Sequence, residues 1–294
     1  MMFSSLVIVL IAFLIVADAF KRIPQQPPVD STTEVENSSN LRGSADLAAA
    51  NPHMMTYRGG RIIPTSHVVP IYAALNFPMA ANLTSYYRNL RTGNFIEFHK
   101  KEYNLKKQKF TSGSVLQPVT FDWSSPTRPL VTDTLQQNFL AAIASGALPR
   151  PTKNTVYAIH FQGGYISEAG GSCLDAVSEY CGFHQGITIG NIYAPVMFIP
   201  DMTVPSCTGC AYNIDNVPIT PINAFYSTIS HELSEVMTDP DVNYASLTWY
   251  NDVDGEDADY CGNRMGTIVM ADKRSHPVQM IWSNKSKKCV VPRK

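Results

Sequence analysis

The sequence predicts an α/β fold in which a mixed sheet packs against one central helix. Short apolar segments bounded by turn residues come before and after a helical pattern, and this succession of strands and helices favours a mixed sheet. A globular composition without an internal repeat runs from residue 53 to residue 294, a length that suits one domain.

The first 52 residues do not have the composition of a folded domain. An apolar run from Leu6 to Val16 precedes Ala17-Asp18-Ala19, so residues 1–19 are expected to be a secretory signal peptide, too short to span a bilayer. Residues 20–52 are rich in Pro, Ser, Thr, Asn and Gln and are expected to form a disordered spacer or a propeptide. The protein is therefore expected to be secreted and extracellular, without stable membrane insertion.

Strands are expected where β-branched and aromatic residues gather. These segments are residues 60–64, 68–74, 155–161 and 194–199, with a closing hairpin formed by residues 266–270 and 278–282. A first helix is expected between the capping residue Thr132 and Gly146. Four apolar residues share one face of this helix: Leu135, Phe139, Ala142 and Ile143.

The central helix is expected between Thr220 and Pro240. Thr220 is suited to cap the first turn, and Pro221 is favourable at the first helical position. Asp239 precedes a proline and is therefore disfavoured in the helical conformation. An apolar stripe recurs at helical spacing along this segment: Phe225, Ile229, Leu233, Val236 and Met237.

Three ionisable residues of this helix indicate a function. His231 and Glu235 are four positions apart and project from one helical face, and Glu232 follows the histidine directly. The H-E-x-x-H helix of zinc proteases has this layout, here with a carboxylate as the second ligand. We therefore expect a zincin-like (metalloprotease-like) domain with zinc at His231 and Glu235 and with Glu232 as the catalytic base. The alternative is an amphipathic surface helix whose polar side chains are only solvated.

An acidic segment follows the helix, with five carboxylates between Asp252 and Asp259. Such a loop needs a cation or hydrogen-bond donors to offset its charge. Glu256 lies 21 positions after Glu235 and is the expected third metal ligand. Asp259 is expected to accept the free ring N–H of His231 or to act as an alternative ligand, and Asp252 is a further alternative. A calcium loop around Asp252-x-Asp254-Gly255 and a solvated acidic turn are the competing interpretations.

The remaining polar residues leave alternatives open. His184 lies close to Cys181 and is either a further ligand or, as is more common, a hydrogen-bonded structural histidine. Asn37, Asn82 and Asn284 lie in N-glycosylation sequons, and Asn82 and Asn284 are the candidate sites in the globular domain. The net charge of −1 argues against nucleic acid as a partner.

Six cysteines in a secreted chain predict three disulfides, for which the sequence alone allows fifteen sets of pairs. Proximity in the sequence favours Cys173–Cys181 and Cys207–Cys210, which leaves Cys261–Cys289. The last pair would tie the acidic segment to the C-terminal strand.

Several motifs together resemble the exordium, or phosphate-induced protein, family. In the order of that family they are Met55-Thr-Tyr-Arg-Gly-Gly-Arg-Ile-Ile-Pro64, Val156–Phe161, Cys173…Cys181-Gly-Phe-His184, Cys207…Cys210, Ser230-His-Glu-Leu-Ser-Glu-Val-Met-Thr-Asp-Pro240, Trp249…Cys261 and Trp282…Cys289. The complete Ser230–Pro240 motif is similar to microbial rather than plant members. Arg58 departs from the family, which commonly has His there. The resemblance implies a secreted, cell-surface or matrix protein without an established reaction.

Two functions therefore follow from the sequence. The first is a zinc-dependent peptidase or other hydrolase that uses a metal-activated water. The second is a non-catalytic extracellular binding or signalling module, in which the same residues hold a structural metal or a hydrogen-bond network. The expected partner is an extracellular protein, a peptide or a component of the cell wall or matrix. Zinc is the expected metal, and calcium is the weaker alternative.

Overall fold

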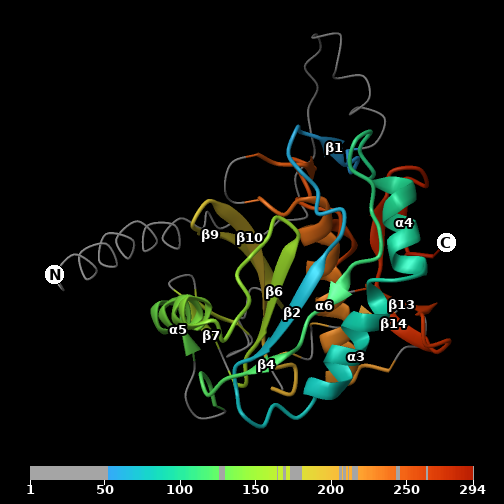
Figure 1. Ribbon diagram of the computed structural model, residues 1–294. Coiled ribbons are helices and arrows are strands. Elements are labelled where there is room, and N and C mark those ends of the chain that lie inside the picture. Colours follow the sequence, from blue (N-terminus) through green and yellow to red (C-terminus); the bar gives the residue numbers. More distant parts are fainter. Residues whose placement is uncertain are drawn as a thin grey trace.

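The computed structural model describes residues 52–125, 130–163, 165–167, 170–172, 181–204, 207, 210, 212–213, 218–242, 246–262 and 264–293. The predicted signal peptide, the predicted spacer up to residue 51 and Cys173 lie outside these residues. The fold is α/β with a mixed sheet (Figure 1).

The main sheet has six strands. Its order is β3 (Ser114–Val115), β2 (His67–Tyr72), β6 (Thr155–His160), β10 (Ile192–Ile199) and β9 (Phe183–Ile189), and β4 (Val119–Thr120) also pairs with β2. Strands β2, β6 and β10 are parallel, whereas β9 runs antiparallel to β10. The central strands are buried on both faces, which explains why they are almost continuously apolar.

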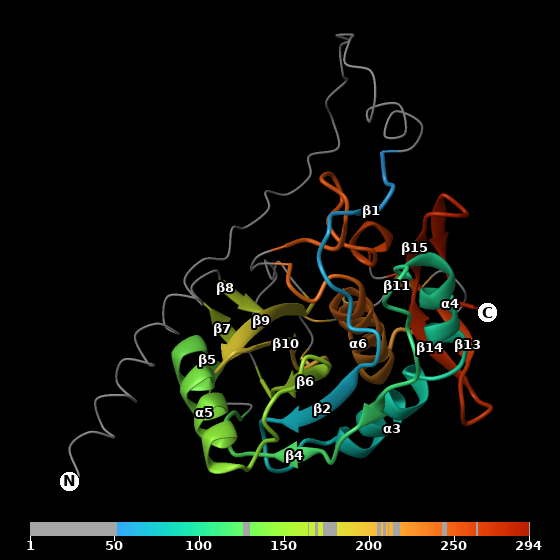
Figure 2. The same ribbon diagram turned by 45° about the horizontal axis from the view of Figure 1, so that its top comes forward.

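Helices cover both faces of this sheet (Figures 1 and 2). Helices α3 (Ala80–Leu90), α4 (Asn94–Glu102) and α6 (Pro221–Thr238) lie on one side, and α5 (Thr132–Ser145) lies on the other. Side chains alternate between the two faces along each strand, so that Val68 packs with α6 and Val69 packs with α5.

Smaller sheets complete the described part of the chain. They are β1 (Thr56–Tyr57) with β12 (Trp249–Tyr250); β11 (Tyr212–Asn213) with β13 (Arg264–Val269) and β14 (Ser275–Gln279); β15 (Ile281–Ser283) with β16 (Lys288–Val290); and β5 (Leu130–Val131) with β7 (Tyr165–Ser167) and β8 (Gly170–Ser172). A short 3-10 helix, Asp259–Cys261, ends the acidic segment.

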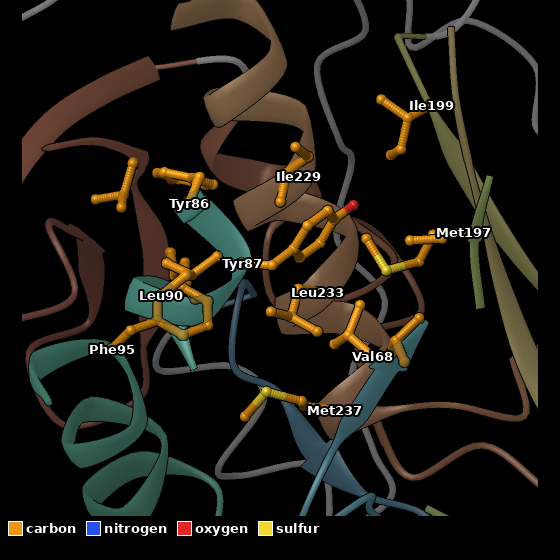
Figure 3. Packing of buried hydrophobic residues seen from close by; sticks show 14 of the residues in the cluster. Val68, Tyr86, Tyr87, Leu90, Phe95, Met197, Ile199, Ile229, Leu233 and Met237 are labelled. Carbon is orange, nitrogen blue, oxygen red and sulfur yellow. The ribbon is translucent and has the colours of Figure 1, made fainter. Parts of the chain in front are cut away.

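Helix α6 lies at the centre of the larger hydrophobic core. Its residues Ile229, Leu233 and Met237 contact the cluster that also contains Tyr87 of α3 and Met197 of β10 (Figure 3). The helix begins and ends as predicted: the Thr220 hydroxyl accepts from the Asn223 backbone N–H at 3.3 Å, and Asp239 follows the last helical residue. Because this apolar stripe is buried, it determines which polar residues of the helix point away from the sheet.

Most predicted elements are confirmed, with three differences. The strand expected at residues 60–64 is wrong: this segment has no strand pairing, and its backbone bonds to Met237 and Leu247 instead. The hairpin of β13 and β14 is confirmed, but residues 281–282 belong to β15, which pairs with β16. Helices α3 and α4, strand β9 and most of the short strands were not predicted; these short strands are β1, β3, β4, β5, β7, β8, β11, β12 and β16.

The disulfide pairing predicted from proximity is wrong for the two short loops and confirmed for the long one. Cys181 pairs with Cys210, 29 residues away, which excludes both Cys173–Cys181 and Cys207–Cys210. Cys261 pairs with Cys289 as expected. The first bond fixes the chain just before β9, and the second connects the acidic segment to β16.

Candidate metal site

Two residues of α6 form the centre of the site. His231 and Glu235 are one helical turn apart, and the Nε2 atom of the histidine lies 2.9 Å from Oε1 of the glutamate. The side chain of His231 is 17% exposed, whereas that of Glu235 is only 4% exposed. The site therefore has an accessible side at the histidine and a closed side behind the glutamate.

Gln279 of β14 orients the imidazole ring of His231. Its side-chain Nε2 donates to the Ala258 carbonyl at 2.9 Å, so its Oε1 atom faces the ring and lies 2.9 Å from Nδ1. Since an amide oxygen can only accept, Nδ1 carries the proton. The Nε2 lone pair of a neutral His231 then points at Glu235, which is the arrangement of a histidine prepared for a metal.

Asp259 completes a first group of possible ligands. Its Oδ1 lies 3.6 Å from His231 Nε2, and its Oδ2 accepts from the Glu256 backbone N–H at 2.8 Å. The ligand atoms of His231, Glu235 and Asp259 all lie within 4.8 Å of one another. Asp259 thus takes its alternative predicted place, on the ligand side of the ring. The ring N–H that it was expected to accept is bound by Gln279, which the sequence analysis missed.

His184 is the centre of a second group, deeper in the protein. Its Nδ1 lies 3.4 Å from Glu232 Oε2 and 3.6 Å from Glu235 Oε2. These ligand atoms also lie within 4.8 Å of one another. The backbone comes this close because residue 182 is glycine: a Cβ there would lie 2.9 Å from Glu232 Oε1. The structure therefore brings His184 into the site, where it can act as a further ligand. This was the less common of the two roles predicted for it.

Glu256 contacts the second group rather than the first. Its Oε1 lies 3.5 Å from His184 Nε2, which is also 3.3 Å from the Asp239 carbonyl oxygen. Asp259, and not Glu256, completes the group around His231. The expected ligand set of His231, Glu235 and Glu256 is therefore not brought together.

The acidic segment directs its other carboxylates to separate partners. Asp252 forms an exposed ion pair with Arg58 at 2.6 Å, well outside the site. Asp254 pairs with His53, and the Asn251 side chain accepts from the backbone of the next turn. Because Asp252 and Asp254 contact different groups, the calcium loop that they suggested is not formed in this structure. Asp252 is likewise not placed as a ligand.

A buried network anchors the acidic segment to α6. Ser234 Oγ lies 2.7 Å from His99 Nε2 and 2.8 Å from Asp257 Oδ2. Burial raises the pKa of Asp257 to about 8 and lowers the pKa of His99 to about 4. This network positions Glu256, which directly precedes Asp257, and Asp259, which lies two positions after it. No spacing rule in the sequence indicated it, because His99 is far away in the chain.

The charges in the site are strongly coupled. Burial by itself lowers the pKa of His184 and of His231, but neighbouring carboxylates, chiefly Glu256 and Glu235 respectively, raise both well above the usual value. Burial also raises the pKa of Glu232 and of Glu256. The site therefore collects more negative charge than it can hold in a buried place without protons or cations.

Several carboxylate oxygens in the site are buried without a hydrogen bond. They are Glu232 Oε2, Glu235 Oε1, Glu256 Oε1 and Asp239 Oδ2. Glu235 Oε1 is close to His231 Nε2 but does not form a hydrogen bond with it. Buried polar atoms are normally paired, so these unpaired carboxylate oxygens call for protons or a cation to offset their charge. Oxygen and imidazole nitrogen atoms in this arrangement fit a divalent cation.

The sequons at Asn82 and Asn284 occupy different surroundings. Asn82 is exposed on α3, although Thr84 of the same sequon is buried and bonds to the Tyr72 hydroxyl at 2.8 Å. The Asn284 side chain bonds to both backbone groups of Met55. A glycan on Asn284 would compete with this contact.

Comparisons with models of known protein families, with curated proteins and with solved structures found no match. Among the described residues, no helix has the length and apolar character needed to cross a membrane. The disulfides Cys181–Cys210 and Cys261–Cys289 are compatible with a secreted protein.

Proposed function

We propose that this protein is a secreted zinc-dependent hydrolase, and that His231, Glu235 and Asp259 hold the cation. The observation that carries the proposal is the orientation of His231, whose Nδ1 is bound by Gln279 and whose Nε2 faces two carboxylates. Zinc accepts one nitrogen and two oxygen ligands and leaves a fourth position for water or substrate. Calcium is the weaker alternative, because it prefers oxygen ligands only.

A zinc ion in this place would supply a Lewis acid and lower the pKa of a water molecule. Glu232 is then the base that accepts the proton of the attacking water. Its own pKa is raised, chiefly by burial, which suits a base that works near neutral pH. His231 and Asp259 are on the accessible side, where a peptide or another extracellular carbonyl substrate would approach.

A non-catalytic role remains the second candidate, and burial favours it. The side chains of Glu232 and His184 are each only 2% exposed, so most of the cluster is closed to substrate. Closed sites are typical of structural metals. In this case the cation would hold α6, β9 and the acidic segment together in an extracellular binding module.

We also propose membership of the exordium family. Three of the motifs that resemble the family lie close together in space, and this supports the membership. Each contributes to one site: Cys181–His184, Ser230–Pro240 and Trp249–Cys261. Because members of a family preserve a site as a unit, three motifs meeting at one place argue against a chance resemblance.

Elemental analysis and a hydrolysis screen of the purified secreted protein test the function. We expect at least one equivalent of zinc per chain, and the loss of one equivalent in His231→Ala. His276→Ala is the matched control, since His276 pairs with Asp272 outside the site. Unchanged zinc content in His231→Ala would exclude the site. Glu232→Gln should keep the cation at His231 but lose hydrolysis, and equal activity would exclude the role of Glu232 as the base.

A further inference from the structure

We propose that the cluster binds two divalent cations with Glu235 as a bridging ligand. The second position is formed by His184 Nδ1, Glu232 and Glu235, behind the position at His231. This inference rests on the proposed metal site and adds a claim about stoichiometry. It makes Glu232 a ligand of the second cation, so the role of Glu232 as a base belongs to the arrangement with one cation.

The two histidines are presented in the same way. In each ring, the nitrogen that points away from Glu235 lies next to a hydrogen-bond acceptor. For His231 this acceptor is Gln279 Oε1, and for His184 Nε2 it is the Asp239 carbonyl oxygen at 3.3 Å, with Glu256 Oε1 at 3.5 Å. Such acceptors fix the tautomer, so the other nitrogen of each ring is left with its lone pair towards the carboxylates.

Glu235 faces each histidine with a different oxygen. Its Oε1 lies 2.9 Å from His231 Nε2, and its Oε2 lies 3.6 Å from His184 Nδ1. A carboxylate that presents one oxygen to each of two ligand groups is suited to bridge two cations, as in sites with paired metal ions. Glu232 supplies the next oxygen on the His184 side, and Asp259 supplies it on the His231 side.

The charge of the cluster also fits two cations better than one. Four carboxylates, Glu232, Glu235, Glu256 and Asp259, lie within 3.6 Å of the two rings. Three of them have a buried oxygen without a hydrogen bond. One divalent cation offsets two negative charges, so one of these three buried carboxylates would stay protonated or uncompensated, whereas two cations offset all three. Uncompensated buried charge is costly, so the larger neutralisation is favoured.

A protonated His184 is the competing arrangement. An imidazolium ring between Glu256 and Glu232 would itself act as a counter-ion, and the pKa of His184 is raised well above its usual value once these carboxylates outweigh the effect of burial. That arrangement leaves room for one cation only, at His231. The two arrangements therefore differ in stoichiometry.

Zinc titration of the chelator-treated secreted protein, followed by calorimetry and by elemental analysis, distinguishes them. We expect two equivalents in the wild-type protein, one in His184→Ala and one in His231→Ala. Glu232→Gln, which changes shape least, should also bind one equivalent. Glu235→Gln should weaken both positions together, by at least tenfold each. His276→Ala should bind two, and near-ultraviolet circular dichroism checks that each variant is folded.

The outcomes separate this inference from the function on which it rests. One equivalent in both the wild-type protein and His184→Ala, with its loss in His231→Ala, would overturn the second position and leave the zinc site at His231 in place. No zinc in folded wild-type protein would overturn both. Two equivalents that persist in both His184→Ala and Glu232→Gln would place the second cation elsewhere and so overturn the bridge.

Discussion

Gln279 and His231 are 48 positions apart in the sequence, yet Oε1 of the glutamine lies 2.9 Å from Nδ1 of the histidine. Gln279 is fully buried and makes two further bonds: its backbone N–H donates to the Ser230 hydroxyl, and its side chain donates to the Ala258 carbonyl. One residue of β14 thus connects α6 with the acidic segment. The position of the His231 ring therefore depends on tertiary structure as well as on the helix.

The first prediction concerns this contact. Gln279→Leu removes the acceptor of the His231 N–H, so the tautomer is no longer fixed, and the zinc affinity should fall about 10–100-fold. Gln279→Glu is the control, because its carboxylate still accepts from Nδ1 although it loses the donor to Ala258. We expect near wild-type affinity in that variant, with lower stability. Equal affinities in all three proteins, measured by competition with a chelator, would contradict the orienting role.

The second prediction compares two glycines with positive φ. Gly255 has φ +88°, and a Cβ there would lie 2.2 Å from Asp259 Oδ2; Gly146 has φ +80° with nothing within 4 Å. Alanine at either position should cost about 1–2 kcal/mol of stability, because L-residues disfavour this conformation. Only Gly255→Ala should also displace Asp259 and weaken zinc binding. The measurements are urea denaturation and zinc titration, and a similar loss of affinity in Gly146→Ala would contradict the placement of Asp259.

The sequence predicted the parts of the site that depend on local rules. A capping threonine, a proline at the first turn and a final Asp-Pro define α6, and the i, i+4 spacing places His231 beside Glu235. These features need only helical geometry. The same is true of the strands β2, β6 and β10, whose apolar runs report burial on both faces.

Contacts between distant segments could not be predicted in this way. Cys181 pairs with Cys210 rather than with a nearer cysteine, because the pairing depends on where β9 begins in the folded chain. Gln279 is the last residue of β14, and its contact with His231 follows only from the position of this strand beside α6. Asp259, and not Glu256, is the partner of His231, and this too depends on the path of the acidic segment in the folded chain.

The third prediction uses two disulfides of the described part of the chain as a matched pair. Cys181–Cys210 and Cys261–Cys289 enclose loops of nearly equal length, with sequence separations of 29 and 28 residues. Replacing either pair by serines should therefore cost similar stability, roughly 3–4 kcal/mol. Their effects on zinc should differ, because Cys181 is three residues from His184, whereas Cys261 is two residues from Asp259. Loss of the first bond should selectively weaken the cation position at His184, and loss of the second should weaken the position at His231. Identical titration curves for the two variants would contradict this division.

The fourth prediction concerns a histidine outside the site. His160 is fully buried among aromatic rings, with its Nε2 3.0 Å from the Tyr87 hydroxyl, and burial lowers its pKa to about 3. In the unfolded chain the pKa of histidine is about 6.5, so the unfolded state binds more protons between these two values. The neutral ring therefore contributes stability that is complete above pH 6.5 and is lost as the pH falls towards 3. Its share of the slope is at most about 1.4 kcal/mol per pH unit.

His160→Phe removes this titration and keeps an aromatic ring among Tyr72, Phe77 and Phe225. Urea denaturation at several values between pH 7.5 and pH 4.5 (roughly the accessible part of the window) should show a shallower loss of stability in the variant than in the wild-type protein. Tyr87→Phe is the control, since it deletes the hydrogen bond to the ring but leaves the histidine to titrate. It should lower stability at neutral pH and keep most of the slope. If His160→Phe and the wild-type protein lost stability in parallel, the acid sensitivity would have to come from other groups, such as His99, whose pKa burial lowers to about 4.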